Sequence, residues 1–119
     1  MPKILVVDDS PTTLKAITDL LGNQGYIVIT ASDGEEALNK ALSEQPELIL
    51  LDVVLPGANG FQICRQLKTD ESTKGIKVIL VTSKDQKTDR FWGMKQGADA
   101  YITKPFENNE LLKHVQASL

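Results

Sequence analysis

The sequence predicts one α/β domain, built on a five-stranded parallel sheet with helices on both faces. Short apolar runs rich in branched residues alternate with amphipathic helical segments along the whole chain. Such runs are typical of strands buried on both faces, and strict alternation with helices is typical of a parallel sheet. A length of 119 residues with 41% hydrophobic residues suits a single globular domain, which we expect to span residues 1–119.

The first half of the chain contains three expected strands, at residues 3–7, 26–30 and 48–52. A helix between the first two has Ser10 as its expected N-cap and Pro11 at its first position. It is expected to end near Gly22 or Gly25. The segment 33–36 (Asp-Gly-Glu-Glu) resembles a capping box and predicts the start of the second helix.

The second half repeats the alternation, with expected elements at 59–67 (helix), 77–82 (strand), 87–96 (helix), 100–103 (strand) and 108–118 (helix). In the fourth helix Phe91 and Trp92 are adjacent, so they point about 100° apart and cannot both face the core. We expect Phe91 to point inward and Trp92 to be partly exposed. An exposed tryptophan is a candidate anchor for a partner, although it could also simply cover the edge of the core.

The expected topology brings three aspartates together. Right-handed crossovers leave few arrangements, and the common five-stranded order is 2-1-3-4-5. Its ligand crevice lies outside the carboxyl ends of strands one and three. The first strand runs into Asp8 and Asp9, and the third ends in Asp52. The sequence therefore predicts an acidic crevice at this edge of the sheet.

An acidic crevice needs a cation, because neighbouring carboxylates repel and raise one another's pKa. Mg²⁺ takes oxygen ligands, usually one or two carboxylates with water or phosphate oxygens as the rest. Asp52 could be a nucleophile that forms an aspartyl phosphate. Thr82 and Lys104 end or follow strands at the same edge, and could neutralise charge on a transferring phosphoryl group.

Four motifs together resemble the receiver domain of two-component response regulators. In chain order they are Asp8-Asp9, Asp52-x-x-x-Pro56-x-x-x-Gly60, Thr82-Ser83 and Lys104-Pro105-Phe106. The resemblance covers the chain from Lys3 to the last helix and implies the CheY-like, flavodoxin-like fold. It implies a signalling protein, not an enzyme with a separate substrate: it would catalyse only its own phosphorylation and slow dephosphorylation.

The resemblance also implies a division of labour at the crevice. Asp52 would accept the phosphoryl group from a histidine kinase. Asp9, Asp52 and the backbone carbonyl of Val54 would ligate Mg²⁺ directly, while Asp8 would act through bound water. Lys104 would pair with the phosphoryl oxygens.

The same resemblance implies a conformational switch. Thr82 would be its hydroxyl and Tyr101 its aromatic residue, although Tyr101 could equally be core packing. Movement of both would change the surface of the fourth helix, fifth strand and fifth helix, where Trp92 and Tyr101 are candidate partner contacts. The peptide bond between Lys104 and Pro105 would be cis, which only a minority of X-Pro bonds are.

Two variable positions bear on the lifetime of the phosphoryl group. Val54 and Lys84 lie two residues after Asp52 and Thr82 respectively, where the family tunes the attack of water. Val54 offers no side-chain hydrogen bond to that water. We therefore expect slow autodephosphorylation.

A narrower resemblance concerns segments 82–97 and 56–62, which are similar to PilH-type regulators of type IV pilus chemosensory systems. It implies a CheA-like histidine kinase or phosphotransfer protein upstream, and a motility or pilus protein downstream. Because the chain ends near Leu119, we expect no output domain and an output through protein contact. A monomer is expected, with dimerisation on phosphorylation left open.

Composition argues against several other partners. The net charge of −3 and the lack of a basic stripe argue against nucleic acid. No apolar run approaches the roughly 20 residues that span a bilayer. The N-terminus lacks a signal-peptide pattern, and the single cysteine, Cys64, excludes an internal disulfide. A cytoplasmic protein is expected.

Two other classes of protein remain open beside a response regulator. The first is an enzyme of similar architecture, either flavodoxin-like or a phosphatase. A flavodoxin-like enzyme would need free amides for a phosphate in the first strand–helix loop, where this chain has two aspartates. A phosphatase using aspartyl chemistry would usually place its nucleophile after the first strand. The third class, a phosphorylation-independent interaction domain, is disfavoured because all five expected functional positions are present.

Overall fold

A computed structural model describes residues 1–119 as one three-layered α/β fold. Five parallel strands form the sheet in the order β2-β1-β3-β6-β7. Their bounds are β1 Lys3–Val7, β2 Ile27–Ala31, β3 Leu48–Leu51, β6 Lys77–Thr82 and β7 Ala100–Thr103. Counted along the main sheet alone, this is the predicted order 2-1-3-4-5.

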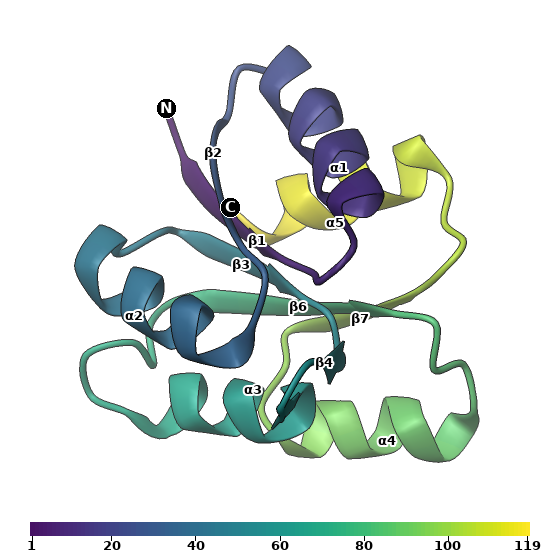
Figure 1. Ribbon diagram of the computed structural model, residues 1–119. Coiled ribbons are helices and arrows are strands. Elements are labelled where there is room, and N and C mark those ends of the chain that lie inside the picture. Colours follow the sequence, from purple (N-terminus) through teal and green to yellow (C-terminus); the bar gives the residue numbers. More distant parts are fainter.

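Five helices cover the sheet, and their bounds are α1 Pro11–Asn23, α2 Gly34–Glu44, α3 Gly60–Thr69, α4 Lys87–Lys95 and α5 Asn108–Ser118. Figure 1 shows α1 and α5 on one face of the sheet and α2, α3 and α4 on the other. None of these helices is long and apolar enough to cross a membrane.

The core lies in two layers because side chains alternate along each strand. In β1, Leu5 and Val7 face the layer under α2 and α3, whereas Ile4 and Val6 face the layer under α1 and α5. The strand β3 alternates in the same way. Both layers are apolar, which explains why these strands appear in the sequence as unbroken apolar runs.

The predicted caps are present, with one difference. The side chain of Ser10 accepts a hydrogen bond from the amide of Thr13, and Pro11 is the first residue of α1. Asp33 accepts from the amide of Glu36, as expected for an N-cap. In a capping box the Glu36 carboxylate would accept from the amide of the N-cap, Asp33. It accepts instead from the amide of Ser32, one residue earlier, at 2.8 Å. This bond lowers the pKa of Glu36.

The prediction that Phe91 points inward is wrong, since 60% of this residue is exposed. Gly93 is the buried residue of α4. A Cβ there would lie 2.8 Å from Leu80 Cδ1 and 2.9 Å from Tyr101 Cδ2, so only glycine lets α4 come this close to the sheet. Phe91 precedes Gly93 by two positions, about 200° around the helix, and therefore points to solvent.

A two-stranded hairpin, β4 Val54–Leu55 with β5 Ala58–Asn59, was not predicted. Its turn is Pro56-Gly57, where Gly57 has a φ of 64°, a conformation that glycine adopts readily. Strands of two residues are too short to show a periodic pattern. The hairpin joins β3 to α3 and lies beside the acidic crevice.

Candidate phosphoryl and metal site

The three aspartates lie together where β1 and β3 end. These strands are neighbours in parallel register, with Val7 paired to Leu51, so the residues that follow emerge side by side. One carboxylate oxygen from each of Asp8, Asp9 and Asp52 lies within 4.8 Å of the others. We call these three residues the acidic cluster. Asp8 and Asp52 are buried, and Asp9 is exposed.

Lys104 supplies the cation that the acidic cluster needs within the chain. Its Nζ donates to Oδ2 of Asp8 and, at 3.0 Å, to Oδ2 of Asp52. Burial alone would lower the pKa of Lys104, but hydrogen bonds and charge interactions with Asp8 and Asp52 outweigh burial and raise it. Lys104 is therefore held charged between the two buried carboxylates.

Backbone contacts fix the position of Lys104. Its amide donates to the carbonyl of Thr82 at 2.8 Å, which extends the pairing of β6 and β7 by one residue. The following bond, Lys104-Pro105, is cis, as the family resemblance implied. Lys104 therefore reaches the acidic cluster from the carboxyl end of β7, which pairs with β6.

The remaining oxygens of the buried aspartates accept hydrogen bonds from nearby amides. Asp8 Oδ1 accepts from the amide of Ser10 at 2.9 Å, and Asp52 Oδ1 accepts from the amide of Val54 at 3.0 Å. Asp9 has no such bond or ion pair within the chain, so its carboxylate is free to take a ligand from solvent. Hard oxygen donors grouped in this way suit Mg²⁺.

Gly60 shapes the segment that follows Asp52. A Cβ at this position would lie only 2.4 Å from the carbonyl oxygen of Asp52 and 2.4 Å from Cα of Val53. The amide of Gly60 donates to the Val53 carbonyl at 2.8 Å. The first turn of α3 therefore packs directly on the backbone that carries Asp52, which explains the spacing between these two residues.

The hydroxyl and aromatic residues predicted for the switch lie on β6 and β7. Thr82 is fully buried, and its Oγ1 accepts from the amide of Lys84 at 3.4 Å. Tyr101 is buried with its ring inward, and its hydroxyl donates to the Lys84 carbonyl at 2.7 Å. Burial raises the pKa of Tyr101 from 10.0 to about 12.

Arg90 and Gly93 hold Tyr101 from the side of α4, and the sequence did not single out either of them. The Arg90 guanidinium lies 5.2 Å from the centre of the Tyr101 ring and donates to the Tyr101 carbonyl and the Thr103 hydroxyl. A glycine inside a helix often marks close packing, so Gly93 carried a usable signal. An arginine on a polar helix face carried none.

The structure brings most of the predicted site residues together and leaves one apart. Those at the carboxyl edge of the sheet are Asp8, Asp9, Asp52, Val54, Thr82 and Lys104. Tyr101 lies on β7, whose register pairs Tyr101 with Leu80 and Thr103 with Thr82. Trp92 lies on α4, outside this group and 55% exposed, as expected for a surface residue.

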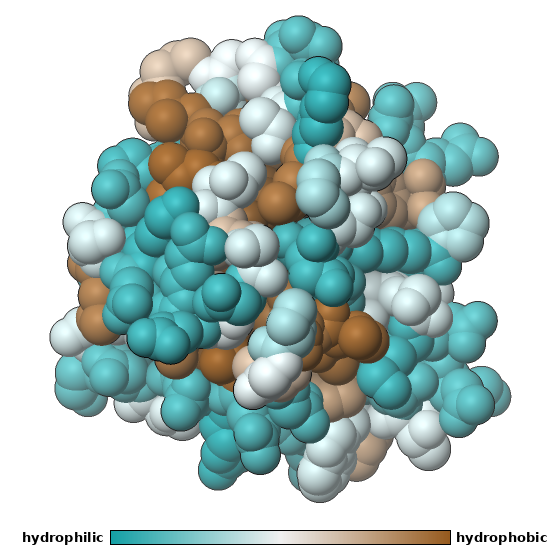
Figure 2. Space-filling view, viewed as in Figure 1, coloured by the Kyte–Doolittle hydropathy of each residue, from teal (hydrophilic) through white to brown (hydrophobic).

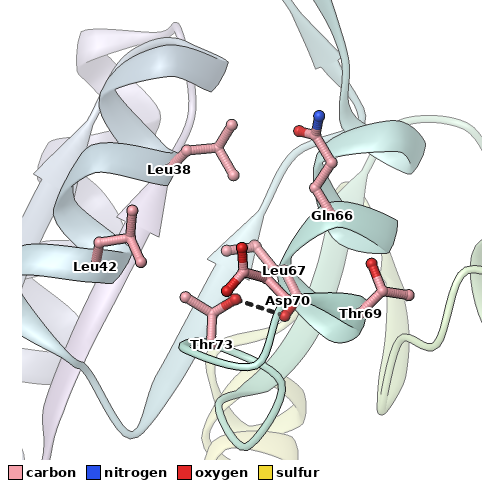
Figure 3. A pocket seen from close by; sticks show the side chains of 7 residues that line it. All are labelled: Leu38, Leu42, Gln66, Leu67, Thr69, Asp70 and Thr73. Atoms are coloured by element: carbon pink, nitrogen blue, oxygen red, sulfur yellow. Dashed lines mark hydrogen bonds between the residues drawn. The ribbon is translucent and has the colours of Figure 1, made fainter.

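A groove between α2 and α3 lies away from this site. It has a volume of about 350 Å³ and is lined by Leu38, Leu42, Gln66, Leu67, Thr69, Asp70 and Thr73. Figure 3 shows these side chains around the opening, with the Thr73 hydroxyl donating to the Leu67 carbonyl at 2.7 Å. No residue of the acidic cluster lines it, so it offers no substrate pocket for chemistry at Asp52.

A doubly wound fold with an acidic cluster and a lysine at its switch point defines a phosphoaccepting signalling domain. The chain belongs to the response regulator receiver domain family, whose profile matches residues 4–116. It is 47% identical to Protein PilH of Pseudomonas aeruginosa over 119 residues, which cover 100% of this chain and 98% of that protein. It spans only 48% of PhoP, a transcriptional regulatory protein of Bacillus subtilis that is 45% identical over 117 residues.

Solved structures agree with this assignment. The chemotaxis protein CheY4 of Vibrio cholerae superposes with a TM-score of 0.93 at 33% identity, covering 100% of this chain and 99% of that one. The receiver domain of the sensor histidine kinase PA1611 of Pseudomonas aeruginosa has a TM-score of 0.89 at 29% identity, covering 98% and 95% respectively. That structure is described with a magnesium ion coordinated in its active-site cleft.

Proposed function

We propose that this chain is a cytoplasmic response regulator domain, phosphorylated on Asp52 in a pilus-based motility or taxis pathway. The observation that carries the proposal is the position of Asp52, which is buried beside two more carboxylates and contacts the ammonium group of Lys104. The match to PilH over nearly the whole of both chains supports the pathway.

The proposed reaction transfers a phosphoryl group from a phosphohistidine to Asp52. A carboxylate oxygen of Asp52 attacks phosphorus, the P–N bond breaks, and its electron pair leaves with the imidazole nitrogen. Lys104 is already placed to neutralise the arriving oxygens. Thr82 supplies a hydroxyl from the end of the next strand. A CheA-like histidine kinase or phosphotransfer protein would be the donor.

The acidic cluster fits Mg²⁺. Asp9, Asp52 and the Val54 carbonyl would hold it directly, and Asp8 would contribute through water. When bound, Mg²⁺ neutralises charge on the oxygens of the transferring group. Support comes from the grouping of three carboxylate oxygens within 4.8 Å, from the unpaired carboxylate of Asp9, and from the ion described in the PA1611 receiver.

The proposed output is a shift between two conformations of the surface formed by α4, β7 and α5. The phosphoryl group would attract the Thr82 hydroxyl and Lys104, and this would favour the inward position of Tyr101. In the structure Tyr101 is already inward and bonded to Lys84. Phosphorylation would therefore increase the population of this state. A motility or pilus protein would read it, with Trp92 and Tyr101 as candidate contacts.

Intact mass spectrometry after incubation with acetyl phosphate and Mg²⁺ tests the reaction. We expect one phosphate adduct on the wild-type chain, none with Asp52→Asn, and none when a chelator removes Mg²⁺. An adduct that persists unchanged in Asp52→Asn would overturn the assignment of Asp52. Sustained turnover of a general phosphate ester would instead favour the phosphatase class, because the proposal allows only slow hydrolysis of the protein's own acyl phosphate.

Transfer from a purified CheA-like kinase of a pilus system tests the pathway. We expect faster transfer to this chain than from an unrelated histidine kinase. Equal rates from both kinases would contradict the pathway while leaving phosphorylation of Asp52 intact.

A further inference from the structure

The groove between α2 and α3 takes no part in the chemistry proposed at Asp52. Its volume of about 350 Å³ lies within the range of sites that bind small molecules. Figure 3 shows Leu38 and Leu42 extending from α2 toward the side chains of α3 and of the segment that follows it. The groove therefore has two walls that come from different helices.

Three leucines supply the apolar part of the lining. Leu38 and Leu42 are spaced i, i+4 on α2, and Leu67 belongs to α3. Leu67 is buried, Leu38 is half-buried and Leu42 is 49% exposed. The two leucines of α2 follow Ala37 and Ala41, which lie in the core, so they stand about 100° around the helix from that face. An apolar group bound here would remove surface of Leu38 and Leu42 from water.

Hydrogen bonds fix one end of the groove without a ligand. Gln45, the residue after α2, has a φ of 46°, which is uncommon for residues other than glycine. Its side-chain Nε2 donates to the carbonyl of Ser72 at 3.1 Å and so ties α2 to the segment after α3. In that segment the amides of Thr73 and Lys74 donate to the carbonyl of Asp70. The two walls are therefore held relative to each other, as in a preformed site.

The two threonines that line the groove can only accept further hydrogen bonds. A hydroxyl has one proton to donate and two lone pairs. The Thr73 hydroxyl donates its proton to the Leu67 carbonyl at 2.7 Å, and the Thr69 hydroxyl donates to the Arg65 carbonyl at 2.8 Å. Both oxygens keep a lone pair, and neither has a proton left for a ligand.

Asp70 is the only charged side chain in the lining, and it lacks a counterion. Its Oδ1 accepts from the amide of Ser72 at 2.8 Å, and its Oδ2 accepts no hydrogen bond within the chain. Asp70 forms no ion pair, whereas the neighbouring Glu71 is paired with Lys74 at 2.9 Å. Among the lining side chains only Gln66 can donate a hydrogen bond, so the groove has an excess of acceptors and of negative charge.

We propose that this groove binds a small organic cation, in which a primary ammonium group is carried on an aliphatic or aromatic body. The ammonium group has three donors and no acceptor, which complements the free oxygen of Asp70 and the threonine lone pairs. The apolar body packs against the three leucines. A carboxylate or phosphate ligand is excluded, because Asp70 repels it and the lining has no cation to offset the repulsion. The inference goes beyond the proposed function, which makes no use of this groove.

Three compounds that share a phenyl body test the proposal: phenethylamine, phenethyl alcohol and hydrocinnamate. Each is titrated into the full isotope-labelled chain with Mg²⁺ present, and the amide chemical shifts are followed by NMR. We expect the amine to shift residues 38–45 and 66–73 with a dissociation constant on the order of 1 mM, which suits so small a ligand. Hydrocinnamate should bind at least about tenfold more weakly. Added salt should weaken binding of the amine and leave that of the alcohol unchanged.

Matched variants separate the charge from the apolar lining. Asp70→Asn keeps the oxygen that accepts from Ser72 and removes the charge, so the amine should bind about tenfold more weakly and the alcohol equally well. Glu71→Gln, at the next residue but outside the lining, should change neither. Leu42→Ala should weaken both ligands several-fold, and Met94→Ala, at an exposed residue of α4, should weaken neither. Asp70 and Leu42 are exposed, so the fold should tolerate both changes.

Several results would overturn the proposal. Equal affinity for the amine and hydrocinnamate, or unchanged binding of the amine to Asp70→Asn, would remove the role of charge. Shifts confined to the acidic cluster would show that the amine binds only there. A dimer that Leu42→Ala abolishes would assign the groove to a second copy of the chain, and binding of a leucine- and arginine-containing peptide but not of the amine would assign it to a partner protein. The phosphate adduct on Asp52 is measured separately, so failure of the proposed function is distinguishable from all of these.

Discussion

The hydroxyl of Tyr101 donates a 2.7 Å hydrogen bond to the backbone carbonyl of Lys84. This bond ties the last strand of the sheet to the loop between β6 and α4. The same loop follows Thr82, the last residue of β6, whose hydroxyl accepts from the Lys84 amide. One residue, Lys84, is therefore held from both sides by the two residues proposed to switch.

Removal of the Tyr101 hydroxyl should make stability less sensitive to alkaline pH. The raised pKa means that the folded state favours the neutral phenol. Its contribution is therefore complete below pH 10.0 and is lost as pH rises towards about 12. Tyr101→Phe should lower the free energy of unfolding by about 1 kcal/mol at neutral pH and flatten its decline in this window. Urea unfolding at a series of pH values measures both effects.

Tyr26→Phe is the control for that experiment, because Tyr26 is the only other tyrosine. Its hydroxyl makes no hydrogen bond within the chain, so Tyr26→Phe should leave the free energy of unfolding at neutral pH unchanged. Lys104 acts in the same direction at high pH, since its pKa is also raised, so some decline will persist in Tyr101→Phe. An identical decline in wild type and Tyr101→Phe would contradict the role given to the phenol.

Replacement of Lys104 by methionine should make stability depend on Mg²⁺. Two buried carboxylates, Asp8 and Asp52, would lose their common cation and repel one another. We expect the free energy of unfolding to fall by about 1–3 kcal/mol without metal, and Mg²⁺ to restore more of it than it adds to wild type. Denaturant unfolding with Mg²⁺ or with a chelator measures this. Lys113→Met should show no such difference.

Gly60→Ala should be strongly destabilising. The added methyl group would lie 2.4 Å from the backbone carbonyl of Asp52, and backbone cannot rotate away as a side chain can. We expect a loss of about 2–4 kcal/mol in the free energy of unfolding. Gly22→Ala is the matched control, because a Cβ there meets nothing within 4 Å and α1 should gain about 0.5–1 kcal/mol. Equal effects of the two substitutions would show that close packing at Gly60 is unimportant.

Val54→Asn should shorten the lifetime of the phosphoryl group several-fold, since an amide beside Asp52 can orient the attacking water. Val54 is 52% exposed, on the hairpin where Figure 2 shows hydrophobic surface among hydrophilic residues. Decay of the phosphate adduct, followed by intact mass after removal of the donor, measures the lifetime. Leu42→Asn, at a residue 49% exposed on α2, controls for a surface amide elsewhere. An unchanged lifetime in Val54→Asn would contradict the expectation of slow autodephosphorylation.

The acidic cluster could be predicted from sequence because two independent patterns meet there. Parallel strands that are neighbours must bring the residues after them to one edge, and the chain has aspartates after its first and third strands. The caps at Ser10 and Asp33 are local and follow from residue type. The rules for helix caps and the rules for parallel sheets therefore both predict structure at the carboxyl edge of the sheet.

The packing of α4 could not be predicted in the same way. The choice between Phe91 and Trp92 assumed that a large apolar residue must face the core. The structure uses Gly93 instead, because the ring of Tyr101 already fills the space beneath the helix. The contacts of Arg90 depend on the distance between α4 and β7, which no spacing in the sequence encodes.

The bridge from Lys104 to the acidic cluster has a consequence for the valence of the bound ion. Three carboxylates and one ammonium leave the site two negative charges in excess. A divalent ion cancels this excess, whereas a monovalent ion leaves one charge and a trivalent ion overshoots. Lys104, which we propose to pair with the phosphoryl group, therefore also determines that the charge of the site is matched by a divalent metal ion.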